Sequence, residues 1–101
     1  MKRAYYSNNI QDFLIEPDSS ILGELTANHS NIILEELQVN AWRKQITILK
    51  DQLRGFGGQI YFEFAIPRMG KLVDNIVIIN NVAFIIEFKV GDGGYEKHAI
   101  E

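Results

Sequence analysis

The sequence predicts a mixed α/β fold of the α+β type, in which a long helix precedes a three-stranded antiparallel meander. Between residues 34 and 53, apolar side chains recur at steps of three and four, as on one face of a helix. From residue 59 onward the chain instead consists of short runs rich in Ile, Val and Phe, which are enriched in strands. The length of 101 residues fits a single domain over residues 1–101.

The long helix is expected over residues 34–53, and three glycines between residues 55 and 58 end it, because glycine readily adopts the left-handed conformation of a helix C-terminus. Its apolar stripe consists of Val39, Trp42, Ile46, Leu49 and Leu53. On this stripe Trp42 is interpreted as a core residue. Two short packing helices are expected before it, one after Ser7 and one after Pro17 with Asp18 among its capping residues.

Three strands are expected over residues 59–66, 72–80 and 82–90. Asn80 and Asn81 separate the second strand from the third, and asparagine tolerates the positive φ that a two-residue hairpin turn requires. Residues 95–101 have the pattern of the first two turns of a further helix.

Composition indicates a globular protein, with 47% hydrophobic and 23% charged residues. The absence of cysteine excludes a disulfide framework and a thiolate zinc site, and is typical of a reducing compartment. No apolar run approaches the roughly 18 residues that a membrane span needs, so a cytoplasmic location without membrane contact is expected. The net charge of −3 argues against a non-specific nucleic-acid coat.

A two-residue turn at Asn80 and Asn81 would pair residues whose numbers sum to 161, which sets Asp74 directly opposite Glu87. Like charges so placed destabilise a hairpin unless something compensates for them. Lys89 lies two residues beyond Glu87 and therefore on the same face of the strand. The sequence thus predicts two carboxylates and one ammonium group at one end of the hairpin.

A plain solvated face of a sheet could also carry two acids and a lysine. However, Ile76, Ile78, Ala83 and Ile85 share this face, which favours a sheet covered on both sides with a polar site at one end. A hard divalent cation, Mg²⁺ or Mn²⁺, is typically held by one or two carboxylates together with water and substrate phosphate oxygens. We therefore predict a metal site at Asp74 and Glu87, with Lys89 orienting the attacking water or neutralising developing charge.

Asp74, followed after twelve residues by Glu87-Phe88-Lys89, resembles the PD-(D/E)xK nuclease superfamily, although Val73 stands where the family motif has proline. More narrowly, RAYYS, IPRMGKLVDNIVII and FIIEFKVG resemble the N-terminal nuclease-like domain of bacterial proteins that carry a Schlafen group 3-like P-loop helicase domain. The resemblance implies a restriction-endonuclease-like core and a magnesium-dependent hydrolase that cleaves nucleic acid, with DNA as the favoured substrate.

The resemblance also implies a second helix and a fourth strand after Glu101, and a helicase domain in cis in a longer parent. A sheet without its closing elements would leave an edge unpaired, so the isolated chain is expected to form a homodimer.

Further candidates have two readings each. Glu63 is either a third metal ligand or a surface acid, and Glu35 is either an additional ligand from the long helix or a first-turn acid favoured by the helix dipole. Arg68 and Lys71 could hold a nucleic-acid backbone or be solvated loop cations. Beside the nuclease, two functions stay open: a non-catalytic module that binds nucleic acid or protein, and a structural dimerisation domain.

Overall fold

The computed structural model describes residues 3–29, 36–91 and 94–95, and it has a mixed α+β fold. The chain begins with strand β1 (Ala4–Asn9) and continues through helices α1 (Ile10–Ile15), α2 (Asp18–Asn28) and α3 (Glu36–Gln52). Strands β2 (Gln59–Ile66), β3 (Lys71–Ile79) and β4 (Val82–Ile86) follow, and then the short strands β5 (Val90–Gly91) and β6 (Gly94–Tyr95).

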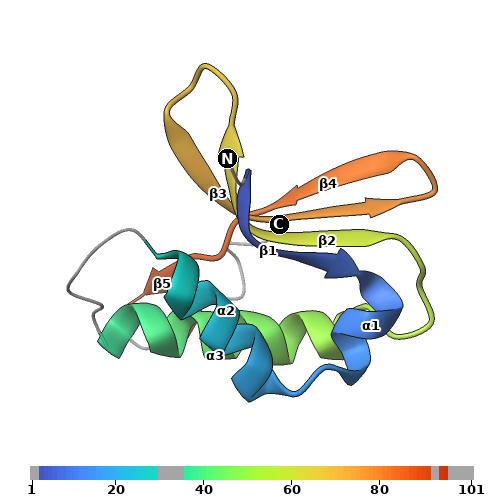
Figure 1. The fold of residues 1–101 in the computed structure, drawn as a ribbon, viewed down its shortest axis with the longest axis horizontal. Helices are drawn as coiled ribbons and strands as arrows, with labels where there is room; N and C mark the ends of the chain where they lie inside the picture. Colours follow the sequence, from blue (N-terminus) through green and yellow to red (C-terminus); the bar gives the residue numbers. More distant parts are fainter. Residues whose placement is uncertain (1–2, 30–35, 92–93, 96–101) are drawn as a thin grey trace.

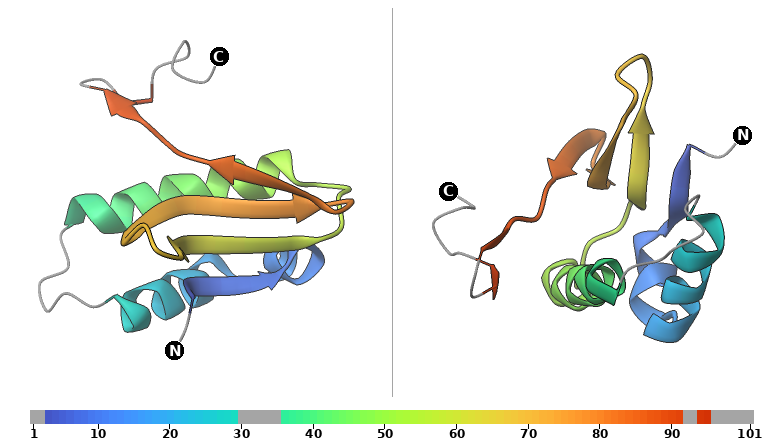
Figure 2. Two further views of the ribbon diagram at one scale, coloured as in Figure 1. Left: turned by 90° about the horizontal axis from the view of Figure 1, so that it is seen from above. Right: turned by 90° about the vertical axis from the view of Figure 1, so that its left-hand side faces the viewer.

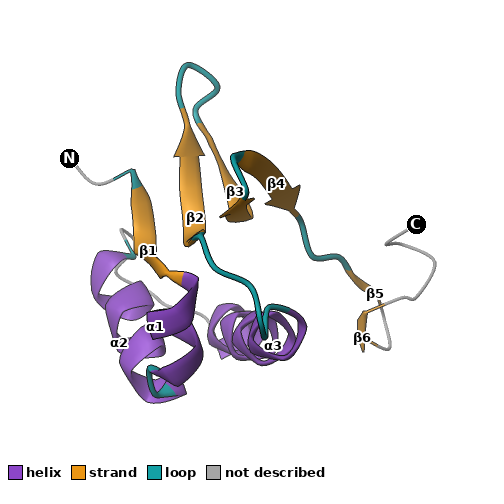
Figure 3. Cartoon of the chain, turned by 90° about the vertical axis from the view of Figure 1, so that its right-hand side faces the viewer, coloured by secondary structure: helices purple, strands orange, loops and turns teal. Residues whose placement is uncertain are grey.

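Strands β1 to β4 form one antiparallel sheet in the order β1-β2-β3-β4, and β5 pairs with β6 separately. The described helices lie together on one face of the four-stranded sheet (Figures 1 and 3). The expectation that both faces of the sheet are covered is therefore not met by the described part of the chain. None of the described helices is long and apolar enough to cross a membrane.

The hydrophobic core lies between the sheet and the helices, and its larger side chains are fully buried. The predicted stripe of the long helix faces this core, since Trp42, Ile46 and Leu49 of α3 are buried. Aromatic rings from three elements meet there, with Tyr6, Phe13 and Phe62 packed against one another at centroid distances of 5.7 to 6.2 Å. The position of Trp42 in the core is as predicted.

Strand β1 was not expected from the sequence. The chain before the first helix was predicted to supply its cap at Ser7, but residues 4–9 pair with β2 instead, from Ala4–Phe64 to Asn9–Gln59. Asn9 caps α1, because its side-chain oxygen accepts the Asp12 N–H at 2.8 Å. The predicted three strands are present as β2, β3 and β4, and β1 adds a fourth strand at the β2 edge.

The C-terminal end of the predicted meander also differs. The strand expected over residues 82–90 ends at Ile86, and residues 87–89 are outside the ladder. Tyr95 lies in β6 rather than at the start of a helix, and the rest of the expected helix lies outside the described residues.

The hairpin β2–β3 bends in mid-strand, and its tip projects away from the helices (Figure 1). Among the non-glycine residues of the described strands, Glu63 alone has a positive φ, of 53°. Such a conformation is rare for a residue with a side chain and turns an extended chain. The bend therefore has a local cause at Glu63.

Candidate metal site at the bend of the sheet

The turn at Asn80 and Asn81 fixes the register of β3 and β4 as predicted. Both asparagines have positive φ, 52° and 66°, as a two-residue hairpin turn requires. The pairs run from Ile79–Val82 to Asn75–Ile86, so that the paired residue numbers sum to 161. One step beyond the last pair, this register sets Asp74 against Glu87.

Two hydrogen bonds hold the Asp74 and Glu87 segments together. The Asp74 N–H donates to Glu87 Oε2 at 3.2 Å, and the Phe88 N–H donates to Asp74 Oδ2 at 2.7 Å. If β4 continued past Ile86, the Phe88 N–H would donate to the backbone of β3. It donates to the Asp74 carboxylate instead. This exchange ends β4 at Ile86 and keeps both acids at the same point of the sheet.

The electrostatic environment of Asp74 disfavours its charged form. Burial raises the pKa of the Asp74 carboxyl above its ordinary value, and the bond from the Phe88 amide opposes this rise. The negative charge of Glu87 and a carboxyl hydrogen bond to Glu87 raise the Asp74 pKa further. A nearby cation would reverse these effects, because it favours the ionised carboxylate.

Glu63 is the third acid at this point. The β2–β3 pairs on either side of it, Phe62–Asn75 and Phe64–Val73, set it opposite Asp74, as a symmetric connection between the strands predicted. Its carboxylate accepts the indole N–H of Trp42 at 3.1 Å. Burial raises the pKa of Glu63, the Trp42 bond lowers it, and the charge of Asp74 raises it again.

Two residues beside the site were not singled out as functional from the sequence. Trp42 is fully buried and yet donates to Glu63, and the His29 ring packs edge-on against it at 5.7 Å between centroids. His29 lowers the pKa of Glu63 by its charge. The apolar stripe of α3 indicated that Trp42 is buried, but no sequence pattern links a helix residue to one particular strand residue.

Lys89 lies in the exposed segment after β4. Within the part of the chain that the structure describes, it forms no ion pair with Asp74 or Glu87, and the ion pair found there joins Lys50 to Asp18 at 2.7 Å. The structure therefore brings Asp74, Glu87 and Glu63 together, and Lys89 follows Glu87 by two residues without an ion pair to Asp74 or Glu87 in the described part of the chain.

The remaining candidate residues are not among the three acids at the bend of the sheet. Arg68 is in the exposed turn between β2 and β3, and Lys71 is the first residue of β3, also exposed. Both belong to the tip of the hairpin that projects away from the helices (Figure 1). Glu35 lies outside the described residues.

The donor set fits a hard divalent cation with few protein ligands. Asp74 and Glu87 offer carboxylate oxygens, the ligand type that Mg²⁺ takes, and two carboxylates are enough when water and substrate oxygens complete the shell. Among residues 3–29, 36–91 and 94–95, no group of three or more His, Cys, Asp or Glu side chains is arranged to hold a metal ion. Glu63 lies opposite Asp74 beside the two-carboxylate site, and its role as a third ligand stays a prediction.

Searches for related proteins found no family model, no curated protein and no solved structure that matches this chain.

Proposed function

We propose that this chain is a nuclease domain in which Asp74 and Glu87 hold a divalent cation, Mg²⁺ or Mn²⁺, for phosphodiester hydrolysis of nucleic acid, with DNA as the substrate. The observation that carries the proposal is the convergence of the two carboxylates one step past the β3–β4 ladder. The proposal includes a restriction-endonuclease-like core. Its support is the order of the elements, in which the long helix α3 is followed by the antiparallel strands β2, β3 and β4.

The unfavourable charge at the site supports a cation rather than a purely structural role. Asp74 and Glu63 both have raised pKa values, and in both cases neighbouring carboxylates contribute. Such arrangements destabilise a small domain unless a ligand of the folded state compensates. A bound cation would supply a Lewis acid for the phosphate and lower the pKa of a coordinated water.

The other residues take roles around the two ligands. Lys89, three residues past the end of β4 and exposed, would reach the attacking water or the phosphate once nucleic acid is bound. Arg68 and Lys71, on the projecting hairpin, would contact the phosphate backbone. In a longer parent, such a domain would work in cis with an ATP-driven helicase.

One observation favours a second candidate, a non-catalytic module that binds nucleic acid or protein. Asp74 and Glu87 each accept a backbone amide, as acids that only tie two strands together would do. In that case the chain would bind its partner through the hairpin tip without hydrolysing it.

A cleavage assay separates the two candidates. The chain would be incubated with single-stranded and double-stranded DNA in Mg²⁺, Mn²⁺ or EDTA, beside Glu87→Gln and the matched control Glu24→Gln, which replaces an exposed acid in α2. We expect metal-dependent cleavage by the wild type and the control and none by Glu87→Gln, because the amide keeps the shape of the side chain and loses the charge that holds the cation.

Cleavage that persists in Glu87→Gln would remove this residue from the mechanism. Metal-independent DNA binding without cleavage in all three proteins, measured by fluorescence anisotropy, would instead establish the binding module.

A further inference from the structure

We propose that two copies of this chain associate through strand β4, by antiparallel pairing of β4 with β4 about a two-fold axis. Strand β4 is the outermost strand on its side of the sheet, and β5, which follows it, pairs with β6. Figure 2 shows β1 and β4 at opposite sides of the sheet. The outer edge of β4 is therefore open within the described part of the chain.

The two edges of the sheet differ in their protection. At the β1 edge the strand ends in Ser7, Asn8 and Asn9, and α2 packs against it with Asn28 donating to the Tyr5 carbonyl at 2.9 Å. Strand β4 has no charged residue, proline or bulge, which are the features by which edge strands usually avoid pairing. Val82, Phe84 and Ile85 are 52%, 50% and 61% exposed.

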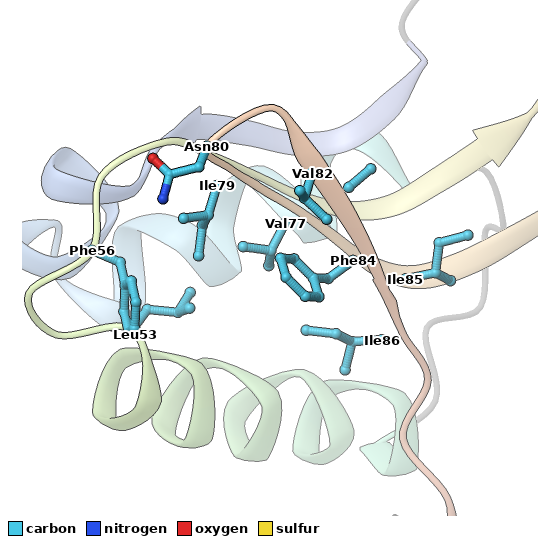
Figure 4. A pocket seen from close by; sticks show the side chains of 10 residues that line it. Leu53, Phe56, Val77, Ile79, Asn80, Val82, Phe84, Ile85 and Ile86 are labelled. Atoms are coloured by element: carbon cyan, nitrogen blue, oxygen red, sulfur yellow. The ribbon is translucent and has the colours of Figure 1, made fainter.

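An apolar groove lies beside this edge. It has a volume of about 770 Å³ and runs between the β3–β4 hairpin and the end of α3. Phe84 and Ile86 lie on the strand side of this groove, and Leu53 and Phe56 lie on the helix side (Figure 4). The exposed apolar surface of β4 is thus continuous with a hollow, which a neighbour could cover.

The hairpin geometry determines which groups of β4 face outward. A two-residue turn is closed by a hydrogen bond between its flanking residues, here Ile79 and Val82, and hydrogen-bonded pairs alternate along the ladder. Val82, Phe84 and Ile86 therefore bond to β3, whereas Ala83 and Ile85 direct their N–H and C=O groups outward. These outward groups can bond to the same groups of a second copy.

A two-fold axis at Phe84 gives a self-complementary register. Ala83 then pairs with Ile85 of the second copy through backbone hydrogen bonds, and Phe84 faces Phe84 of the second copy on the groove side. Glu87 falls opposite Asn81 of the second copy, so that the acids of the two sites do not face each other. Strand β4 is uncharged, so two copies of it can pair without repulsion between like charges. A partner that binds through its charge would find no opposite charge on β4, which favours a second copy of this chain.

The contact area predicts a weak dimer. Phe56 and Phe84 are each about half exposed, and together they could bury on the order of 200 Å² per copy. A standard stable interface buries about 800 Å² per partner, which this edge alone does not reach. Association should therefore depend on concentration and be reversible.

Sedimentation velocity across a wide concentration range tests the interface. We expect a monomer–dimer equilibrium in the wild type, its loss in Phe84→Lys, and its retention in Ile15→Lys, which adds the same charge at an apolar residue that is 80% exposed in α1. A wild type that stays monomeric at the highest concentration, or a dimer that survives Phe84→Lys, would overturn the proposal.

A cross-linking experiment tests the register itself. The chain has no cysteine, so Phe84→Cys introduces a single thiol at the proposed axis. Residues in a pair without hydrogen bonds have Cα atoms about 4.5 Å apart, within the range of disulfides. We expect Phe84→Cys to form the disulfide dimer at least about tenfold faster than Ile15→Cys under mild oxidation, since pairing raises the effective thiol concentration. Equal rates for the two variants would contradict the two-fold axis at Phe84.

Discussion

At the scale of single residues, the site combines carboxylates that repel one another with groups that hold them in place. Asp74 accepts from the Phe88 amide, Glu87 from the Asp74 amide, and Glu63 from the Trp42 indole. The opposition of Asp74 and Glu87 could be predicted from the sequence, because a two-residue asparagine turn determines the register of everything beyond it. The Trp42 contact could not, because it depends on how α3 packs against the bend.

The first prediction concerns pH and Asp74→Asn. The pKa of Asp74 is raised in the folded protein, which means that the fold favours the protonated carboxyl. The stability that protonation of Asp74 contributes is therefore fully present below the ordinary pKa of 3.8. It is lost as the pH rises through the pKa of the folded protein. Asparagine stays neutral and can still accept from the Phe88 N–H. In metal-free buffer we expect Asp74→Asn to melt a few degrees above the wild type at neutral pH and to match it at about pH 3. A variant that melts lower than the wild type at neutral pH would contradict this.

A second prediction concerns Trp42 and Glu63. Trp42→Phe removes the N–H donor and keeps an aromatic ring in the core, and a hydrogen bond to a charged group contributes about 1.5–3 kcal/mol. We expect the free energy of unfolding to fall by about this amount in urea titrations at neutral pH. The double variant Trp42→Phe with Glu63→Gln should lose less than the sum of the single variants. Strict additivity would show that the two side chains are not coupled.

At the scale of elements, the long helix and the three later strands could be predicted from periodicity, because their apolar patterns are strong and glycines and asparagines separate them. Strand β1 could not, since AYYSNN lacks an alternating pattern and runs directly into the α1 sequence. The end of β4 was missed for a different reason. Phe88 continues the alternating apolar row of Phe84 and Ile86, but the Phe88 amide donates to the Asp74 carboxylate and not to the ladder.

The third prediction belongs to the connection between α3 and β2. Gly58 has a φ of +141°, and a Cβ atom at this residue would lie 1.9 Å from the Ile78 carbonyl oxygen. The Gly58 carbonyl also accepts the Ile10 N–H at 2.9 Å, which joins the start of α1 to the sheet. Gly58→Ala should therefore cost on the order of 4 kcal/mol of stability or prevent folding.

Gly57→Ala is the matched control, because nothing lies within 4 Å of the corresponding Cβ position and its φ is not positive. We expect thermal unfolding of Gly57→Ala to be close to that of the wild type. Similar melting temperatures for the two alanine variants would show that Gly58 does not approach the Ile78 carbonyl as described.

At the scale of the whole molecule, the fold places its acids and its exposed apolar surface on different parts of one sheet. Glu63 at the bend contacts Trp42 of α3 and lies opposite Asp74, whereas the open edge at β4 carries Val82, Phe84 and Ile85. Because the proposed dimer register keeps Glu87 of the two copies apart, the metal site and the interface can be disrupted separately. Variants at Glu87 should leave the oligomeric state unchanged, and Phe84→Lys should leave metal binding unchanged.

Calorimetric titration of the wild-type chain with Mn²⁺, repeated with Glu87→Gln and Glu24→Gln, tests the metal site most directly. We predict one bound cation per chain in the wild type and in Glu24→Gln, and none in Glu87→Gln. At a metal concentration about 100 times the dissociation constant, binding should add about 2.7 kcal/mol to the stability of the fold, visible as a higher melting temperature. An absence of binding heat together with an unchanged melting temperature in the wild type would contradict the metal site, and equal binding by Glu87→Gln would place the cation elsewhere.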